Sequence, residues 1–168
     1  MFPIKALDYA IRAHSGQYRK NTGNHYIVHP ISVASHLMSH GIKDVYILEA
    51  ALLHDVVEDT PVRIEDIEET FGLRVRDLVA ELTKKIYLGT REARVAKCTA
   101  DFAQTSEIAQ IIKFADILDN LRDLSKLDPE VSTMYLKEKR RFFSSAKESV
   151  QLSPIGLSLA RVLKVSLT

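Results

Sequence analysis

The sequence predicts an all-α fold, because apolar residues recur at intervals of three and four along most of the chain. No segment alternates convincingly with the period of two expected of a half-buried strand, although residues 26–28 are compatible with a short extended segment. The 168 residues match the length of one domain, and folding should bury roughly 70% of the extended chain's surface. We therefore expect a single all-α domain over residues 1–168, a bundle of about eight helices.

The helices are expected between glycine, proline and capping residues. Gly41 and Gly72 end two of them, Thr60-Pro61 breaks another, and Ser106 is a good N-cap. The expected ranges are 3–14, 31–40, 43–58, 64–71, 73–87, 90–104, 106–124, 129–150 and 154–166.

Composition excludes several classes of partner. The net charge is +1, so no global field attracts a nucleic acid polymer, and a small anionic ligand would need a local cluster of Lys and Arg. No apolar run approaches membrane-spanning length, and the first turns carry Lys5 and Asp8, unlike a signal peptide. One cysteine, Cys98, excludes an intrachain disulfide. We expect a cytoplasmic protein that binds a small molecule, with no membrane and no nucleic acid partner.

The segment AALLHDVVEDT, residues 50–60, is the most informative stretch. In a continuous helix, residues four apart share a ridge, so His54 would lie under Glu58 and Asp55 under Asp59. Four ionisable groups behind an apolar run would repel one another unless a cation lay among them. A divalent ion is the simplest candidate. The alternative is an ordinary polar helix end.

A second group of polar residues lies in the segment 106–124. Asp116 flanks the apolar stripe of this expected helix, and Asn120 follows one turn later. Asp119 falls inside the stripe, where a carboxylate needs a partner. An internal salt bridge, for example with Arg122, is the alternative to a functional role.

A third group lies near the N-terminus, in AHSGQYRK (residues 13–20) and YIVHP (residues 26–30). Arg19 and Lys20 belong to a polar loop, and His29 precedes Pro30, which should start a helix at Ile31. On its own, His29 is more often a packing histidine than a ligand. We expect structural or solvent-facing roles for the histidines without suggestive acidic neighbours, namely His14, His25, His36 and His40.

These groups together suggest one divalent metal ion held by His29, His54, Asp55 and Asp116. Imidazole and carboxylate ligands suit manganese, iron or zinc, and mixed N/O ligation is typical of a catalytic site. A further set of cations recurs at helical spacing, namely Arg91, Arg94 and Lys97. This spacing is compatible with a solvated basic face and with a cluster that faces the pocket.

The chain resembles the HD-superfamily metal-dependent phosphohydrolases, specifically the hydrolase domain of the RelA/SpoT homologues and the single-domain small alarmone hydrolases. The motifs that carry the resemblance are AHSGQYRK, YIVHP, LLHDVVEDT, Phe71-Gly72 and KFADILDNLRDL. They span residues 13–124, and the helices at 129–166 follow this core.

The resemblance implies roles for particular residues. The metal ligands would be His29, His54, Asp55 and Asp116, with Mn²⁺ as the usual ion. Glu58 and Asp59 match the catalytic pair of alarmone hydrolysis. Arg19 and Lys20 match the basic pair beside the nucleotide, and Asn120 matches an asparagine of that pocket. The chain departs from the family at Asp119, where an aromatic residue or histidine is usual, and at Ile117, where a basic residue is usual.

The resemblance also implies an activity, the hydrolysis of the 3′-pyrophosphate of guanosine tetra- or pentaphosphate to GDP or GTP and pyrophosphate. Two alternatives stay open. One is an HD phosphohydrolase that acts on another nucleotide or phosphoester. The other is a non-catalytic nucleotide-binding regulator, which Glu58 and Asp59 disfavour because binding alone needs no water-activating carboxylates. We expect Asp119 to pair with Arg19, Lys20 or Arg122 and to alter nucleotide preference.

Overall fold

The computed structural model describes residues 2–20 and 22–164, and its regular structure is helical. These residues form eleven α-helices and one 3-10 helix, and the only β-type pairing among them is an isolated bridge between Tyr18 and His25. The all-α prediction is confirmed. The chain divides into two compact units, Met1–Thr83 and Lys84–Thr168, which are described separately below. A single domain over residues 1–168 stays a prediction.

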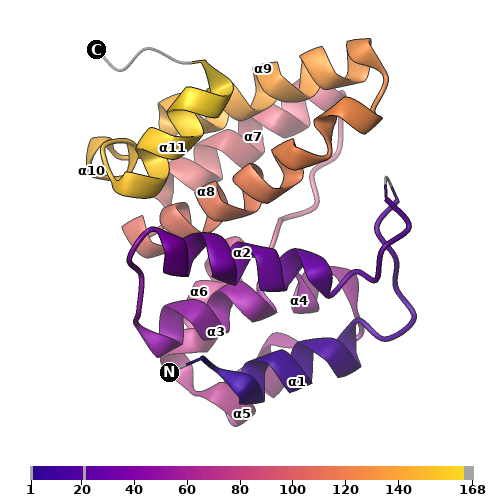
Figure 1. Ribbon diagram of the computed structural model, residues 1–168, viewed down its shortest axis with the longest axis vertical. Helices are drawn as coiled ribbons and strands as arrows, with labels where there is room; N and C mark the ends of the chain where they lie inside the picture. Colours follow the sequence, from indigo (N-terminus) through magenta and orange to yellow (C-terminus); the bar gives the residue numbers. More distant parts are fainter. Residues whose placement is uncertain (1, 21, 165–168) are drawn as a thin grey trace. The chain divides into compact units, whose positions relative to one another are not determined.

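Helix α3 forms the centre of the first unit and contacts α1, α2 and α6. Figure 1 shows α3 between α1 and α2. Five of its nine residues are buried, because its sequence VYILEAALL is apolar on nearly every side. Asp44 caps its first turn by accepting a hydrogen bond from the Tyr46 N–H at 2.9 Å. The helices of this unit are α1 (Ile4–Ala13), α2 (Val28–Ser39), α3 (Val45–Leu53), α4 (Val56–Asp59), α5 (Ile64–Phe71) and α6 (Leu73–Leu82).

Helix α2 begins earlier than the sequence indicated. It starts at Val28, so His29 and Pro30 lie in its first turn, and the extended segment considered at residues 26–28 does not form. Proline is tolerated there because the N–H groups of the first turn have no partner within the helix. The consequence is that His29 projects from a helix rather than from a loop.

The expected helix over residues 43–58 is divided in two. α3 ends at Leu53, His54 and Asp55 form a turn, and the four-residue α4 follows. Asp55 has φ −100° and ψ −6°, which departs from ideal helical values and ends the regular ladder. The prediction of one continuous helix with a single ridge was therefore wrong, although the Asp59 N–H still donates to the Asp55 carbonyl at 2.9 Å.

Helix α8 is the most buried element of the second unit. It starts as predicted, with Ser106 Oγ accepting from the Ala109 N–H at 3.2 Å, and ten of its sixteen residues are buried. Phe114 on its apolar side stacks against Phe143 of α9 at 5.4 Å between ring centroids. The helices of this unit are α7 (Arg91–Gln104), α8 (Glu107–Arg122), the 3-10 helix η1 (Leu124–Lys126), α9 (Pro129–Ser145), α10 (Glu148–Gln151) and α11 (Pro154–Leu163).

Two expected ranges end early. The helix expected to reach Tyr87 ends at Leu82, because Thr83 adopts an extended backbone. The range 129–150 is divided at Ala146, also extended, into α9 and α10. The last two residues of the expected range 154–166 lie outside the described part of the chain. No helix in the described ranges has the length and hydropathy needed to cross a membrane.

Gly156 allows α11 to lie directly against α10. A Cβ at this position would overlap the backbone carbonyl oxygens of Val150 and Gln151, which cannot move as a side chain can. Gly156→Ala should therefore lower the free energy of unfolding by about 3 kcal/mol and the thermal midpoint by roughly 6–12 °C. Calorimetry checks this. Leu157→Ala, at the exposed neighbour, is the control, and an unchanged midpoint in Gly156→Ala would contradict the close approach.

Candidate functional site

Two buried histidines and one carboxylate converge in the first unit. The Nε2 atoms of His29, on α2, and His54, after α3, lie 3.5 and 3.1 Å from the same oxygen, Oδ2 of Asp55. The two imidazole rings meet edge to face, with centroids 5.2 Å apart. Both histidines are almost fully buried, at 3% and 2% exposure. The turn that ends α3 therefore directs His54 and Asp55 toward the first turn of α2.

The donor atoms suit a divalent metal ion. Neighbouring ligand atoms about 2.1 Å from a first-row ion lie roughly 3.0–3.5 Å apart, the range spanned by these contacts. The Nδ1 of His54 lies 2.8 Å from the Ala51 carbonyl oxygen, which assigns the ring hydrogen to Nδ1 and a lone pair to Nε2. Histidine ligands are typically oriented in this way, by a second hydrogen bond from the other nitrogen. Three of the four predicted ligands are thus compatible with a metal.

Tyr26 is a member of this cluster that the sequence analysis missed. Its hydroxyl donates to Asp55 Oδ2 at 2.6 Å and contacts Asp59 Oδ2 at 3.1 Å. Burial, and after it the negative charge of Asp55, raises the pKa of the Tyr26 hydroxyl well above its ordinary value. The hydroxyl therefore remains a donor at neutral pH. Its position three residues before His29 was a usable signal, hidden because residues 26–28 looked extended.

His14 and Gln17 support the same cluster from the loop after α1. The His14 ring lies 4.7 Å from the Tyr26 ring, and its Nδ1 is 2.8 Å from Gln17 Oε1. Gln17 Nε2 donates to the Asp59 carbonyl oxygen at 2.8 Å. The structural role expected for His14 fits its burial, but the sequence did not indicate that it packs beside the predicted site.

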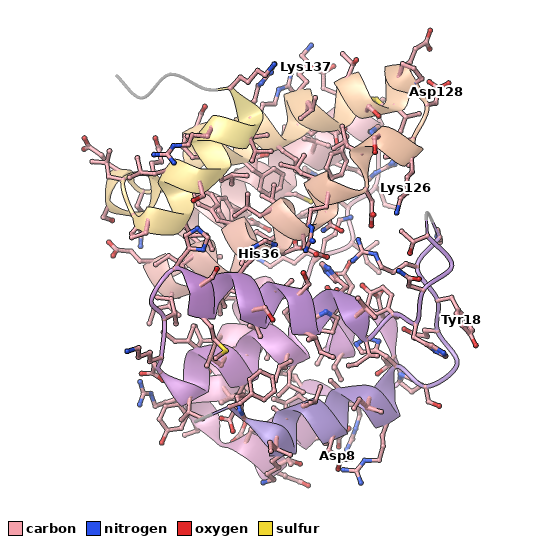
Figure 2. The ribbon with its side chains drawn as sticks, in the orientation of Figure 1. Asp8, Tyr18, His36, Lys126, Asp128 and Lys137 are labelled. Atoms are coloured by element: carbon pink, nitrogen blue, oxygen red, sulfur yellow. The ribbon has the colours of Figure 1, made fainter. Side chains whose placement is uncertain are left out.

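The predicted acid–base pair occupies the short helix α4. Glu58 and Asp59 are both exposed, and the Asp59 carboxylate faces the Tyr26 hydroxyl. The predicted phosphate-binding residues, Arg19 and Lys20, lie in the loop between α1 and α2, where the Arg19 N–H donates to the Asn24 carbonyl at 2.8 Å. Tyr18 marks this loop in Figure 2.

The fourth predicted ligand, Asp116, belongs to the second unit. Lys113 Nζ lies 2.7 Å from Asp116 Oδ2, and the Asn120 amide donates to Asp116 Oδ1. Lys113 was missed by the sequence analysis, although it lies one helical turn before Asp116. Asn120, predicted to bind substrate, here orients this carboxylate. Burial, and after it the positive charge of Lys113, lowers the pKa of Lys139, on α9, to about 8.

Asp119 is buried one turn along the same helix. Its exposure is 6%, and its Oδ1 lies 3.8 Å from Arg122 Nη1. Of the three partners proposed from the sequence, Arg122 is therefore the one seen within this unit. The contact is long, and the Arg122 side chain is 67% exposed, so the ion pair compensates only weakly for burial of the carboxylate.

The basic residues at helical spacing on α7 have structural partners within the second unit. Arg91 forms an ion pair with Glu138 at 2.7 Å, and Arg94 Nη1 donates to the Gly89 carbonyl at 2.8 Å. Lys97 Nζ lies 5.4 Å from the centroid of the Tyr87 ring. All three residues are exposed, and their contacts favour the interpretation as a solvated basic face over a pocket-facing cluster.

The all-α fold and the buried histidine–carboxylate cluster place the chain among helical domains with donor atoms suited to a divalent metal ion. The chain belongs to the HD-domain family, because the family model described as HD domain matches residues 6–145. Membership of this family implies a divalent metal ion, for which the histidine–carboxylate cluster supplies suitable donors.

The similar proteins include alarmone hydrolases. The chain is 42% identical over 130 residues to guanosine-3′,5′-bis(diphosphate) 3′-pyrophosphohydrolase MESH1 of Homo sapiens, covering 76% of this chain and 72% of that protein. It is 37% identical over 137 residues to the bifunctional (p)ppGpp synthase/hydrolase SpoT of Escherichia coli K12, covering 79% of this chain and 19% of that longer protein. A solved structure of a metazoan ortholog of SpoT that hydrolyses ppGpp matches with a TM-score of 0.85 and 34% identity, covering 96% and 93% of the two chains.

Proposed function

We propose that the protein hydrolyses the 3′-pyrophosphate of guanosine tetra- or pentaphosphate, giving GDP or GTP and pyrophosphate, with a divalent metal ion. The observation that carries the proposal is the convergence of His29 Nε2 and His54 Nε2 on Asp55, with Asp59 linked to Asp55 through Tyr26. Relatives that span most of the chain bear the name of this activity, which supports the choice of substrate.

The proposed metal ligands are His29, His54, Asp55 and Asp116, and the proposed ion is Mn²⁺. Asp116 is included from the family resemblance and from its chemistry as a buried carboxylate, which Lys113 and Asn120 hold in one orientation. A divalent ion at such a centre supplies Lewis-acid activation of water and of a phosphoryl oxygen. N/O ligation without thiolate is compatible with manganese.

The reaction needs one proton removed and one proton supplied. Water adds to the phosphorus attached to the 3′-oxygen, and the bond between this phosphorus and the 3′-oxygen breaks. Pyrophosphate leaves with the oxygen of water, and the 3′-oxygen takes up a proton. We assign proton transfer to Glu58 and Asp59, whose exposure on α4 allows them to meet water and substrate. Arg19 and Lys20 are proposed to hold the phosphates, and Asn120 to contact the nucleotide.

The main alternative is an HD phosphohydrolase for another nucleotide or phosphoester. Asp119 favours this alternative, because the resemblance implies an aromatic residue or histidine at this position, whereas a buried carboxylate repels phosphates and offers no aromatic surface for a base. A non-catalytic nucleotide-binding regulator is a weaker alternative, since it gives no use to Glu58 and Asp59. In either case we propose a cytoplasmic protein that acts on a small nucleotide.

A nucleotide panel distinguishes these functions. The purified protein with added Mn²⁺ is incubated with guanosine tetraphosphate, guanosine pentaphosphate, GTP, ATP and a phosphomonoester, and kcat/KM is measured for each. The proposal expects the two alarmones to be turned over fastest. Faster turnover of another phosphoester would favour the alternative hydrolase, and tight binding without any turnover would favour the regulator.

Asp119→Tyr tests whether this position contributes to substrate choice. The change removes a negative charge and adds aromatic surface, so the kcat/KM for guanosine tetraphosphate should rise about 3-fold or more relative to that for the other nucleotides, a difference of roughly 0.7 kcal/mol. Asp123→Tyr, which removes the carboxylate 3.0 Å from Lys126 Nζ on the residues that follow α8, is the matched control. Destabilisation with an unchanged substrate ratio would instead assign Asp119 to a buried structural ion pair.

A further inference from the structure

The Tyr26 hydroxyl lies between two carboxylates that have different proposed tasks. Its oxygen is 2.6 Å from Asp55 Oδ2 and 3.1 Å from Asp59 Oδ2. A hydroxyl carries only one hydrogen, so the shorter hydrogen bond, to Asp55, is the stronger one and the contact with Asp59 is the weaker one. Both carboxylates are thereby held against one donor, at a separation that the donor sets.

The ring that carries this hydroxyl is itself held in place. It packs against the His14 ring at 4.7 Å and meets the His29 ring nearly at right angles, at 5.9 Å. His14 and His29 are each 3% exposed, so neither ring can move aside into solvent. These two ring contacts restrict the rotation of the Tyr26 side chain away from the two carboxylates.

Gln17 holds the backbone of Asp59 as well. Its amide nitrogen donates to the Asp59 carbonyl oxygen at 2.8 Å. The amide oxygen then faces His14 Nδ1, also at 2.8 Å, so His14 carries its hydrogen on Nδ1 and orients the glutamine. Asp59 is fixed at its side chain by Tyr26 and at its main chain by Gln17.

These external contacts are needed because α4 is only four residues long. A single helical turn has few hydrogen bonds of its own and is unstable in isolation. Asp59 is its last residue and is exposed to solvent, so it would fray without partners outside the helix. Tyr26 and Gln17 supply those partners from the loop before α2.

We propose that Tyr26 is a positioning residue that sets Asp59 relative to Asp55, and that His14 and Gln17 support it. This inference rests on the proposed function, in which Asp55 binds the metal and Asp59 takes part in proton transfer. Loss of the Tyr26 hydroxyl and loss of the Gln17 amide should have different effects. Tyr26 contacts both carboxylates, so its loss affects metal binding and proton transfer, whereas Gln17 contacts only Asp59.

Three variants test the separate contributions of Tyr26 and Gln17. Tyr26→Phe removes the hydroxyl, Gln17→Leu removes the amide, and Tyr46→Phe is the control, because Tyr46 belongs to the same unit and packs under Arg74 through its ring alone. Mn²⁺ affinity is measured by calorimetry on the metal-free proteins, together with the thermal midpoint, kcat and KM. Tyr26→Phe should weaken Mn²⁺ binding roughly 10-fold and lower kcat about 10-fold or more, with KM within about 3-fold.

The other variants complete the test. Gln17→Leu should lower kcat about 10-fold while Mn²⁺ affinity stays within about 2-fold of wild type, and Tyr46→Phe should change neither. Wild-type affinity and kcat in Tyr26→Phe would overturn the proposal. If Tyr26→Phe does not fold, Gln17→Leu decides: a lower kcat at unchanged affinity supports the proposal, and an unchanged kcat overturns it.

Failure of the proposed function can be told apart from failure of this inference. The Mn²⁺ titration contains no nucleotide, so it compares Tyr26→Phe with Tyr46→Phe whatever the substrate is. A wild-type protein that does not hydrolyse guanosine tetraphosphate refutes the function. The Mn²⁺ affinities then decide the inference alone, where weaker binding in Tyr26→Phe supports it and equal binding in the two variants overturns it.

Discussion

His54→Ala is expected to abolish metal retention and to reduce hydrolysis about 10³-fold or more. In the proposed metal centre the variant removes one of two buried Nε2 donors, and the remaining donors are not expected to retain the ion against water. Lewis-acid stabilisation worth several kcal/mol is lost with the ion, and about 4 kcal/mol corresponds to a factor of 10³ in rate. Elemental analysis after gel filtration and an assay of pyrophosphate release measure the two losses.

Two further variants make this test specific. Asp55→Asn preserves the volume of the side chain and removes its charge, so it should also lose metal without opening a cavity. His40→Ala removes an imidazole at the end of α2, away from the cluster, and should retain both metal and activity. Full metal content in both His54→Ala and Asp55→Asn would refute the ligand assignment.

Glu58→Gln should reduce kcat about 10²-fold or more while the metal remains bound. Glutamine keeps the size and the hydrogen-bonding capacity of the side chain but cannot accept a proton at neutral pH. Glu58 follows the turn at His54 and Asp55 and is exposed, so the change should have little effect on the free energy of unfolding. Single-turnover kinetics and metal analysis of the same preparation check both statements.

Glu65→Gln is the matched control, because Glu65 is an exposed carboxylate in the first turn of α5. It should leave kcat unchanged. Equal kcat values for wild type and Glu58→Gln would assign Glu58 to structure and leave Asp59 as the proton-transfer group. Loss of metal in Glu58→Gln would instead make it a ligand.

The sequence predicted a helix end well where that end depends on a single capping residue. Ser106 caps α8 as expected, and Gly72, with φ +83°, follows α5 at the expected position. Breaks within apolar runs were not predictable in this way. The turn at His54 and Asp55 interrupts a segment whose local propensities favour helix, and two of the residues that contact Asp55, His29 and Tyr26, come from a distant part of the sequence.

The candidate site was predictable to the extent that it depends on residue type. His29, His54 and Asp55 were recognised as metal-ligand types, and the first unit brings them together. Tyr26, Gln17 and Lys113 were missed, because a tyrosine, a glutamine and a lysine are common residues whose roles here come from contacts with carboxylates. The contacts of Tyr26 and Gln17 depend on tertiary structure, which spacing along the chain does not specify, whereas Lys113 lies one helical turn from Asp116 and was within reach of helical spacing.

The products formed from guanosine tetraphosphate decide whether the protein is an alarmone hydrolase. Wild-type protein loaded with Mn²⁺ is incubated with this nucleotide, and the products are separated by anion-exchange chromatography, with the His54→Ala variant as the blank. GDP and pyrophosphate are expected in equal amounts, and no product is expected from the variant. Unchanged guanosine tetraphosphate, under conditions in which the same preparation hydrolyses another phosphoester, would contradict this expectation.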